Sequence, residues 1–169
     1  MQEMKYLGGY PEETQRQARL LVESDRLAGV LLKRYALAHG VRTDKALYEY
    51  VSQLKKEFLG NADAISKVVF DNKLHVVKHA LGMHTAISRI QGNKLKAKRE
   101  IRISSLFKNV PLEFLKMIAV HELAHFKERE HDRAFYKLCT YMEPDYHQFE
   151  FDVRLYLTHM DTCDEPLWR

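Results

Sequence analysis

Two histidines four residues apart, with a glutamate directly after the first, occur in the stretch AVHELAHFKEREHDRAFY, residues 119–136. On a helix, His121 and His125 project from one face with their Cβ atoms about 6 Å apart. Two imidazoles at that separation can bind one zinc ion about 2.0–2.1 Å from each nitrogen. Glu122 lies about 100° further round the helix, where its carboxylate can take a proton from a water molecule that the metal acidifies. The spacing therefore predicts a catalytic zinc site with its own general base.

A zinc site of this kind needs a third protein ligand, and His131 is the leading candidate. On an unbroken helix His131 would lie about 9 Å further along the axis than His125, so we expect the helix to end between them. Neither glycine nor proline marks that end in the intervening FKERE. Asp132 can cap a new helix over DRAFYKLCTYM, which would place His131 just before its first turn.

Other side chains are alternatives for parts of the same site. Glu143 or Glu150 would be the third ligand if the protein were a zincin that uses glutamate, although capping or solvation explains Glu143 equally well. His147 is a candidate donor to a developing oxyanion, or a histidine on the surface of a helix. The remaining histidines show no ligand spacing and have no predicted role: His39, His75, His79, His84 and His159.

The residues around the HELAH motif predict a buried helix. An apolar run, PLEFLKMIAV, precedes it from Pro111, and Leu123 and Ala124 fill its centre. Histidines and a glutamate on such a helix need a partner, because burying them without one is costly. The competing interpretation is a polar stripe that faces the solvent.

The order of the other elements predicts an α+β fold with a small antiparallel sheet. Helical spacing or capping signals predict three helices in the first sixty residues, starting after Pro11, at Asp25 and at Thr43. A strand is expected over 65–70, and the segments 84–90 and 94–104 read as a hairpin around Gln91-Gly92-Asn93. Segment 74–82 fits a short helix or an extended piece. Helices return from Pro111, at 132–142 and at 146–157.

Length and composition bound the class of protein. At 169 residues with 46% hydrophobic and 30% charged residues, we expect one globular domain over 1–169 rather than a disordered or fibrous chain. No secretory leader and no apolar run long enough to span a membrane are evident, so a cytoplasmic location is expected. Cys139 and Cys163 are then expected to be free thiols.

The basic residues allow two interpretations. The net charge of +4 is too small to establish an anionic partner by itself. Six cations gather in or beside the expected hairpin: Arg89, Lys94, Lys96, Lys98, Arg99 and Arg102. They can protect a sheet edge from pairing with other chains, or they can contact the phosphates of a nucleic acid. Few aromatic residues lie between them, which argues against base stacking.

The wider pattern resembles a known family. HELAH, followed after five residues by HDRAFY and then by MEPDY, resembles the YgjP-like zinc metallopeptidases, which are related to the SprT and WLM group. The resemblance extends over KVVFDNKLHVVKHALGMHTAISRIQGNKLKAKREIRIS, YHQFEFDVRLYL and the opening YLGGYPEE, and so covers nearly the whole chain. It implies a zincin-like fold, Zn²⁺ bound by His121, His125 and His131, and Glu122 as the base. Many members carry R-W-G-S-C where this chain has Arg89-Ile90-Gln91-Gly92, so no role carries over there.

The sequence thus predicts a zinc-dependent hydrolase, with a metallopeptidase as the leading interpretation. A peptide or protein substrate would add as a strand to the EIRIS segment, expected at the sheet edge. The alternative is a non-catalytic binding module stapled by zinc, with nucleic acid as a candidate partner. Three ligands beside a glutamate favour catalysis, because structural zinc sites usually close with four ligands.

Overall fold

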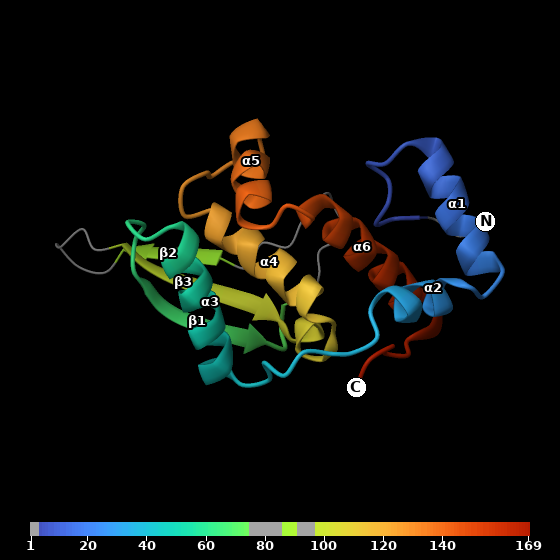
Figure 1. Ribbon diagram of the computed structural model, residues 1–169, viewed down its shortest axis with the longest axis horizontal. Coiled ribbons are helices and arrows are strands. Elements are labelled where there is room, and N and C mark those ends of the chain that lie inside the picture. The colour runs from blue at the N-terminus through green and yellow to red at the C-terminus, as the bar shows by residue number, and fades with distance from the viewer. Residues whose placement is uncertain (1–3, 75–85, 91–96) are drawn as a thin grey trace.

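The computed structural model describes residues 4–74, 86–90 and 97–169, and its elements follow the predicted order of helices, small sheet and helices (Figure 1). The first helices are α1 (Glu12–Glu23), α2 (Leu27–Arg34) and α3 (Asp44–Phe58). The strands are β1 (Ile65–Asp71), β2 (Ala86–Ile90) and β3 (Ala97–Ser104). After the 3-10 turn η1 (Ser105–Asn109) come α4 (Leu112–Ala124), α5 (Arg133–Met142) and α6 (Tyr146–Cys163).

The sheet is mixed, in the order β1-β3-β2. β2 and β3 pair antiparallel, from Ala86 opposite Ile101 to Ile90 opposite Ala97, as the predicted hairpin requires. β1 pairs parallel with β3, with Val68 opposite Ile101, so the prediction of an antiparallel sheet is wrong for this pair. The EIRIS segment belongs to the central strand, so its prediction as an edge strand is also wrong. The undecided segment 74–82 (apart from Leu74) and the Gln91-Gly92-Asn93 turn lie outside the described residues.

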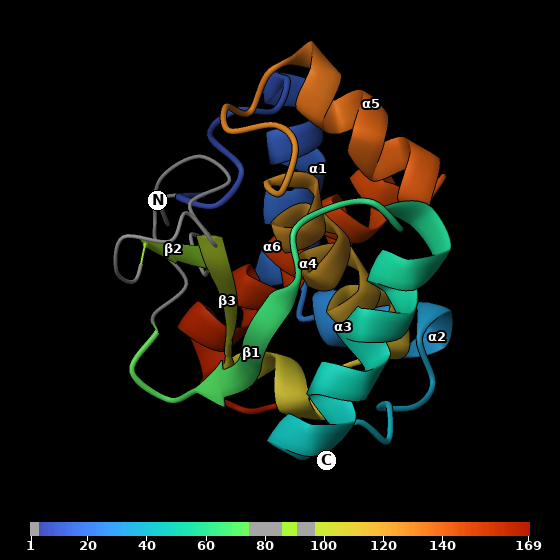
Figure 2. The same cartoon turned by 90° about the vertical axis from the view of Figure 1, so that its left-hand side faces the viewer.

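Two helices cover one face of the sheet. Figure 2 shows α3 and α4 on the same side of the strands, and contacts join α3 to β1, α4 to β3 and the two helices to each other. The apolar stripe of α3 that faces inward includes Leu47, Val51 and Leu54, all buried. The Thr43 hydroxyl caps this helix by accepting a hydrogen bond from the Ala46 amide at 3.1 Å, so α3 begins where the sequence predicts.

α4 occupies the middle of the molecule. It packs against α3 and β3 on one side and against α5 and α6 on the others. Every residue from Met117 to Ala124 is buried, which confirms the prediction of a buried helix and removes the solvent-facing stripe as an interpretation. Large apolar side chains such as Met117 and Ile118 each stabilise the fold by about 1.5–3 kcal/mol through burial. The helix that carries the HELAH motif is therefore held rigidly on nearly all sides.

α1 and α2 lie at the end of the molecule away from the sheet (Figure 1). α1 ends with Asp25 in the left-handed conformation (φ 55°), and the Arg26 amide donates to the Leu21 carbonyl at 2.9 Å. This pattern is a Schellman motif, so Asp25 terminates α1 and is not the cap of α2 that the sequence suggested. α2 packs against α6.

Within the described ranges, no helix combines the length and apolar character needed to cross a membrane.

Candidate metal centre

Three imidazoles converge at the end of α4. His121 is fully buried, and His125 and His131 are half-buried. The His125 Nε2 atom lies 3.0 Å from His131 Nε2, which lies 3.3 Å from His121 Nε2. Two nitrogens bound to one tetrahedral zinc ion at the usual bond length are ~3.3 Å apart. These two separations are close to those of zinc ligands, and the ligand atoms of all three residues lie within 4.8 Å of one another, so the three residues form a group able to hold a metal.

The far side of two of the rings is already engaged. His121 Nδ1 lies 2.8 Å from the hydroxyl of Tyr146, which is fully buried on α6. His125 Nδ1 lies 3.0 Å from the backbone carbonyl of Glu128, to which it can donate. Partners at Nδ1 fix the orientation of a metal-binding imidazole and leave the Nε2 lone pair for the metal. The donor set thus fits zinc in chemistry as well as in spacing.

The turn that brings His131 back toward α4 is held from outside the local sequence. α4 ends at Ala124, with His125 as the capping residue. Arg99 of β3 donates from Nη1 to the His125 carbonyl at 3.2 Å and from Nη2 to the Phe126 carbonyl at 3.3 Å. Its guanidinium also lies 5.0 Å from the centre of the Phe126 ring. These contacts satisfy carbonyls at the helix end, where a cation is also favoured by the helix dipole.

α5 begins as predicted and adds an aromatic wall to the site. The Asp132 carboxylate accepts a hydrogen bond from the Phe135 amide at 3.0 Å and so caps the helix just after His131. The Phe135 ring is buried and touches all three imidazoles, with ring centres 4.9 Å from His121, 4.6 Å from His125 and 4.9 Å from His131. Packing of this kind restricts the rotation of the rings and shields them from water.

Glu122 follows His121 on α4 and is almost completely buried, with 1% of its surface exposed. Burying a carboxylate destabilises the fold unless its negative charge is neutralised, and a neighbouring cation would neutralise it. The three histidines and this glutamate therefore stand together on one buried helix end and the turn that follows it.

Comparison with known proteins places this arrangement in a family. The profile of the YgjP-like metallopeptidase domain matches residues 38–152. The chain belongs to the YgjP-like metallopeptidase family. It is also 58% identical to a protein named UTP pyrophosphatase from Escherichia coli K12. The 160 aligned residues cover 95% of this chain and 96% of that relative. No solved structure shows a significant match.

Both comparisons describe hydrolases, so this member of the YgjP-like family is a hydrolase-type enzyme. A metallopeptidase family also implies a bound metal, which agrees with the group of three histidines. The two descriptions differ in the bond that is cleaved. The family description refers to peptides, whereas the relative's name refers to a nucleoside triphosphate.

The alternative site residues lie elsewhere in this YgjP-like domain. Glu143 forms an ion pair with Lys116, with 2.5 Å between carboxylate and ammonium. Glu150 pairs with Arg154 at 3.2 Å. His147 is exposed and packs on the rings of Tyr136 and Tyr146, each 5.5 Å away between centres. Within the described residues, none of Glu143, Glu150 and His147 belongs to the group of three imidazoles.

The basic residues of the middle segment are only partly described. Arg99 also reaches Asp63 at 3.3 Å, and Arg102 pairs with Asp71 at 3.0 Å. Both guanidiniums are thus engaged within the fold, which leaves neither dedicated to phosphates. Lys94 and Lys96, and the side chains of Arg89 and Lys98, lie outside what the structure describes.

Three residues that shape the site had no predicted role in the metal centre: Arg99, Phe135 and Tyr146. Phe135 and Tyr146 stand inside the motifs HDRAFY and MEPDY that carry the family resemblance, so the motif itself was an available signal. Arg99 carried only a misleading signal, because its place in a basic run suggested a solvated face.

Proposed function

We propose that the chain is a zinc-dependent hydrolase in which His121, His125 and His131 bind the metal and Glu122 is the general base. The observation that carries this proposal is the convergence of three Nε2 atoms within bonding reach of one ion, beside a buried glutamate. The central position of α4 against a small sheet supports the zincin-like fold that the family resemblance implies.

The residues of the chain divide the work. Zinc, when bound, supplies Lewis-acid polarisation of the oxygen that carries developing charge and lowers the pKa of water. Glu122 accepts the proton of the attacking water and can return it to the leaving group. Phe135 holds the imidazoles in place and excludes water from behind them. Tyr146 and the Glu128 carbonyl fix the rotation of His121 and His125.

UTP is the first candidate substrate, because a relative that is 58% identical along almost its whole length has the name UTP pyrophosphatase. In the proposed reaction, the oxygen of water bonds to the α-phosphorus while the bond from that phosphorus to the α–β bridging oxygen breaks. UMP and pyrophosphate result. A cationic groove supports an anionic substrate: Arg133 and Lys137 of α5 line it with His147 of α6. None of the three has an ion pair within the described residues.

A peptide is the second candidate, favoured by the match to a metallopeptidase domain. A peptide bond places developing negative charge on one oxygen, as the phosphoryl group does, so the same metal and base would serve. Because β3 is central, an extended peptide would have to add at another strand, such as β2, which lies at an edge of the described sheet.

The test measures both reactions with the same zinc-loaded protein. Release of UMP and pyrophosphate from UTP is compared with release from ATP and CTP, and a peptide library is incubated in parallel. In Glu122→Gln, size and hydrogen bonding are kept but the base is lost, so the rate should fall by about 10²–10⁴-fold while zinc is retained. Glu130→Gln is the matched control, because Glu130 is an exposed carboxylate in the turn after α4.

Each outcome has a consequence. Hydrolysis of UTP that is lost in Glu122→Gln and kept in Glu130→Gln supports the first candidate. Cleavage of peptides but not of UTP would favour the second. Zinc bound by the wild type with no hydrolysis of either substrate, or equal rates in the two variants, would leave Glu122 without a catalytic role.

A further inference from the structure

A line of polar groups leads from the metal centre into α6. His121 Nδ1 and the Tyr146 hydroxyl are 2.8 Å apart, and both side chains are fully buried. Besides His121, the Tyr146 hydroxyl has two polar neighbours, the buried Cys139 thiol and the carboxylate of Glu150. Glu150 stands one helical turn after Tyr146 on the same helix and is 5% exposed. The interior behind His121 is therefore polar, which is unusual so close to the centre of the fold.

Metal binding dictates the direction of the hydrogen bond at His121. An imidazole that binds a metal through Nε2 carries its proton on Nδ1 and must donate from there. The Tyr146 oxygen then accepts this hydrogen bond, and the phenolic proton of Tyr146 needs an acceptor of its own. Were that proton to point at His121 instead, Nε2 would carry the imidazole proton and could not bind zinc.

Glu150 is the stronger of the two acceptors beside Tyr146. A thiol sulfur accepts hydrogen bonds weakly, whereas a carboxylate oxygen accepts them strongly. Glu150 Oε1 accepts from Arg154 Nε at 3.2 Å. Its Oε2 atom is buried and makes no hydrogen bond of normal geometry within the part of the chain that the structure describes, and the hydroxyls of Tyr146 and Tyr10 both lie near this carboxylate. A buried carboxylate oxygen that lacks a hydrogen bond destabilises the fold, so a hydrogen bond from the Tyr146 hydroxyl would stabilise it.

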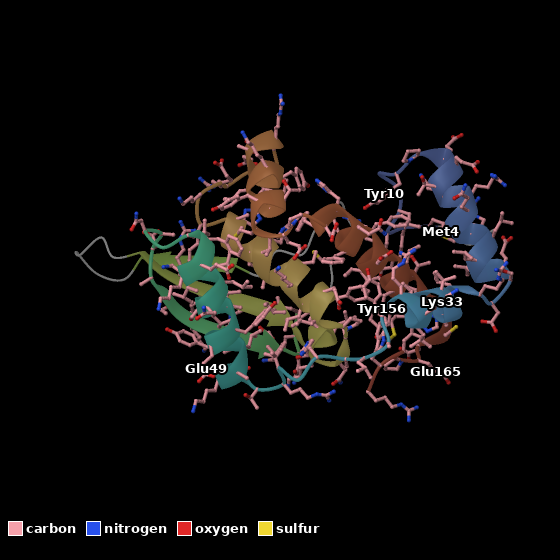
Figure 3. All side chains as sticks on the ribbon, viewed as in Figure 1. Met4, Tyr10, Lys33, Glu49, Tyr156 and Glu165 are labelled. Carbon is pink, nitrogen blue, oxygen red and sulfur yellow. The ribbon has the colours of Figure 1, made fainter. Side chains whose placement is uncertain are left out.

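The carboxylate is held in place from the other side. Arg154 follows Glu150 by one turn and donates from Nη1 to the backbone carbonyl of Tyr6 at 2.8 Å. Its guanidinium lies 5.9 Å from the ring centre of Tyr10, which Figure 3 shows between the N-terminal segment and α6. Burial raises the pKa of Glu150, and the neighbouring Arg154 charge opposes that rise. Arg154 therefore favours the ionised carboxylate that can accept a proton donor.

We propose that Glu150 is a positioning residue of the metal centre: it accepts the hydrogen bond of the Tyr146 hydroxyl and thereby fixes His121 in the form whose Nε2 binds zinc. This inference rests on the proposed function, because it requires His121 to be a zinc ligand. It gives Glu150 a role through two intervening side chains and not as a ligand.

The test measures zinc affinity by competition with a chromophoric chelator, so no substrate is needed. Tyr146→Phe should weaken zinc binding by about 10–100-fold, the usual effect of losing a partner of a metal-binding imidazole. Glu150→Ala removes the acceptor and should weaken it within the same range, and Glu150→Ala in the Tyr146→Phe background should have no further effect. Glu143→Ala is the matched control, since Glu143 is similarly buried but paired with Lys116 away from the imidazoles.

The double variant separates this relay from a general electrostatic or structural effect, because a carboxylate that acted directly would weaken binding equally with and without the Tyr146 hydroxyl. Additive losses, or an affinity of Glu150→Ala equal to that of Glu143→Ala, overturn the relay. So does a loss in Cys139→Ala that exceeds the loss in Glu150→Ala. A wild-type protein that binds no zinc overturns the metal centre itself, and the relay with it.

Discussion

His125 has two tasks at the end of α4. Its backbone is the point where the helix stops, and its ring is one of the three that converge. The hydrogen bond from Nδ1 to the Glu128 carbonyl joins these tasks, because the carbonyl that orients the ring belongs to the turn that the end of the helix creates. The shape of the turn and the direction of the donor atom are therefore set together.

The choice of third ligand gives a prediction at the scale of single residues. His131→Ala removes one of three nitrogens, so zinc affinity should fall by more than the roughly 10–100-fold expected for an outer partner. Glu143→Ala should leave the affinity unchanged, because Lys116 holds that carboxylate. Titration of the metal-free variants with zinc measures both. Loss of binding in Glu143→Ala with binding kept in His131→Ala would reverse the assignment.

The three histidines and Glu122 could be selected from the sequence because their roles depend on spacing along one helix and one turn. Asp132 could be assigned as a cap for the same reason, and the structure confirms it. Tyr146 and Arg99 could not be assigned a role, because each acts on a segment more than twenty positions away. Such contacts exist only after the chain has folded, so the spacing of residues along the chain does not reveal them, although the motif MEPDY did mark Tyr146.

At the scale of elements, Arg99 connects the central strand to the end of the metal-binding helix. The FKERE segment after α4 contains no glycine or proline, and the helix nonetheless ends before it. Two hydrogen bonds from Arg99 satisfy carbonyls that the helix leaves open, and Phe126 packs against the same guanidinium. The sheet thus determines where α4 stops, and β3 positions the site without contributing a ligand.

Replacing Arg99 should affect both stability and metal binding. Arg99→Gln loses the charged donor of two hydrogen bonds, which should lower the free energy of unfolding by about 1–3 kcal/mol. Zinc affinity should fall as well, because the turn that presents His131 loosens. Arg102→Gln is the control: Arg102 pairs with Asp71 and Glu100 on the sheet. Urea unfolding and zinc titration measure the two effects, and equal zinc affinity in the two variants would contradict the role given to Arg99.

The elements themselves were predicted better than their pairing. Capping residues and periodicity located the helices and strands, since both signals are local. The parallel alignment of β1 with β3 was missed because strand periodicity fixes which side chains share a face but not which strand lies alongside. Asp25 was misassigned for a related reason, because an aspartate between two helices suits the start of one and the left-handed end of the other.

At the scale of the whole molecule, the segment between α2 and α3 runs along the edge of the fold and ties its two ends together (Figure 1). His39 is the anchor. Its amide donates to the Val110 carbonyl at 3.0 Å, and its ring lies 2.7 Å from the Phe107 carbonyl through Nε2. The Val41 amide donates to Nδ1 at 3.0 Å, so the ring is held neutral with its proton on Nε2. This histidine therefore has a structural role, although none was predicted for it.

The environment of His39 makes stability depend on pH. Burial lowers the pKa of His39, so the unfolded chain binds this proton more tightly than the folded protein does. The stability that neutral His39 contributes is therefore present above about pH 6.5 and is lost as the pH falls below that value. His39→Gln should show a smaller loss of stability than the wild type between about pH 6.5 and 5, measured by urea unfolding of the metal-free protein. An unchanged slope in His39→Gln would contradict the prediction.

The parallel pairing of β1 with β3 also bears on how quickly the protein folds. The ends of β2 and β3 are near neighbours in sequence, and α3 leads directly into β1, so each of these pairs can form from local contacts. Joining β1 to the pair of β2 and β3 requires residues around 65–71 to meet residues around 99–104 in register. This step closes a long loop, and the chain loses conformational entropy before the contacts between β1 and β3 compensate for that loss. We expect this docking to limit the refolding rate, with the buried pair of Val68 and Ile101 formed late. In a chevron analysis, Val68→Ala should then accelerate unfolding much more than it slows folding, whereas a change confined to the folding limb would place the parallel ladder in the nucleus.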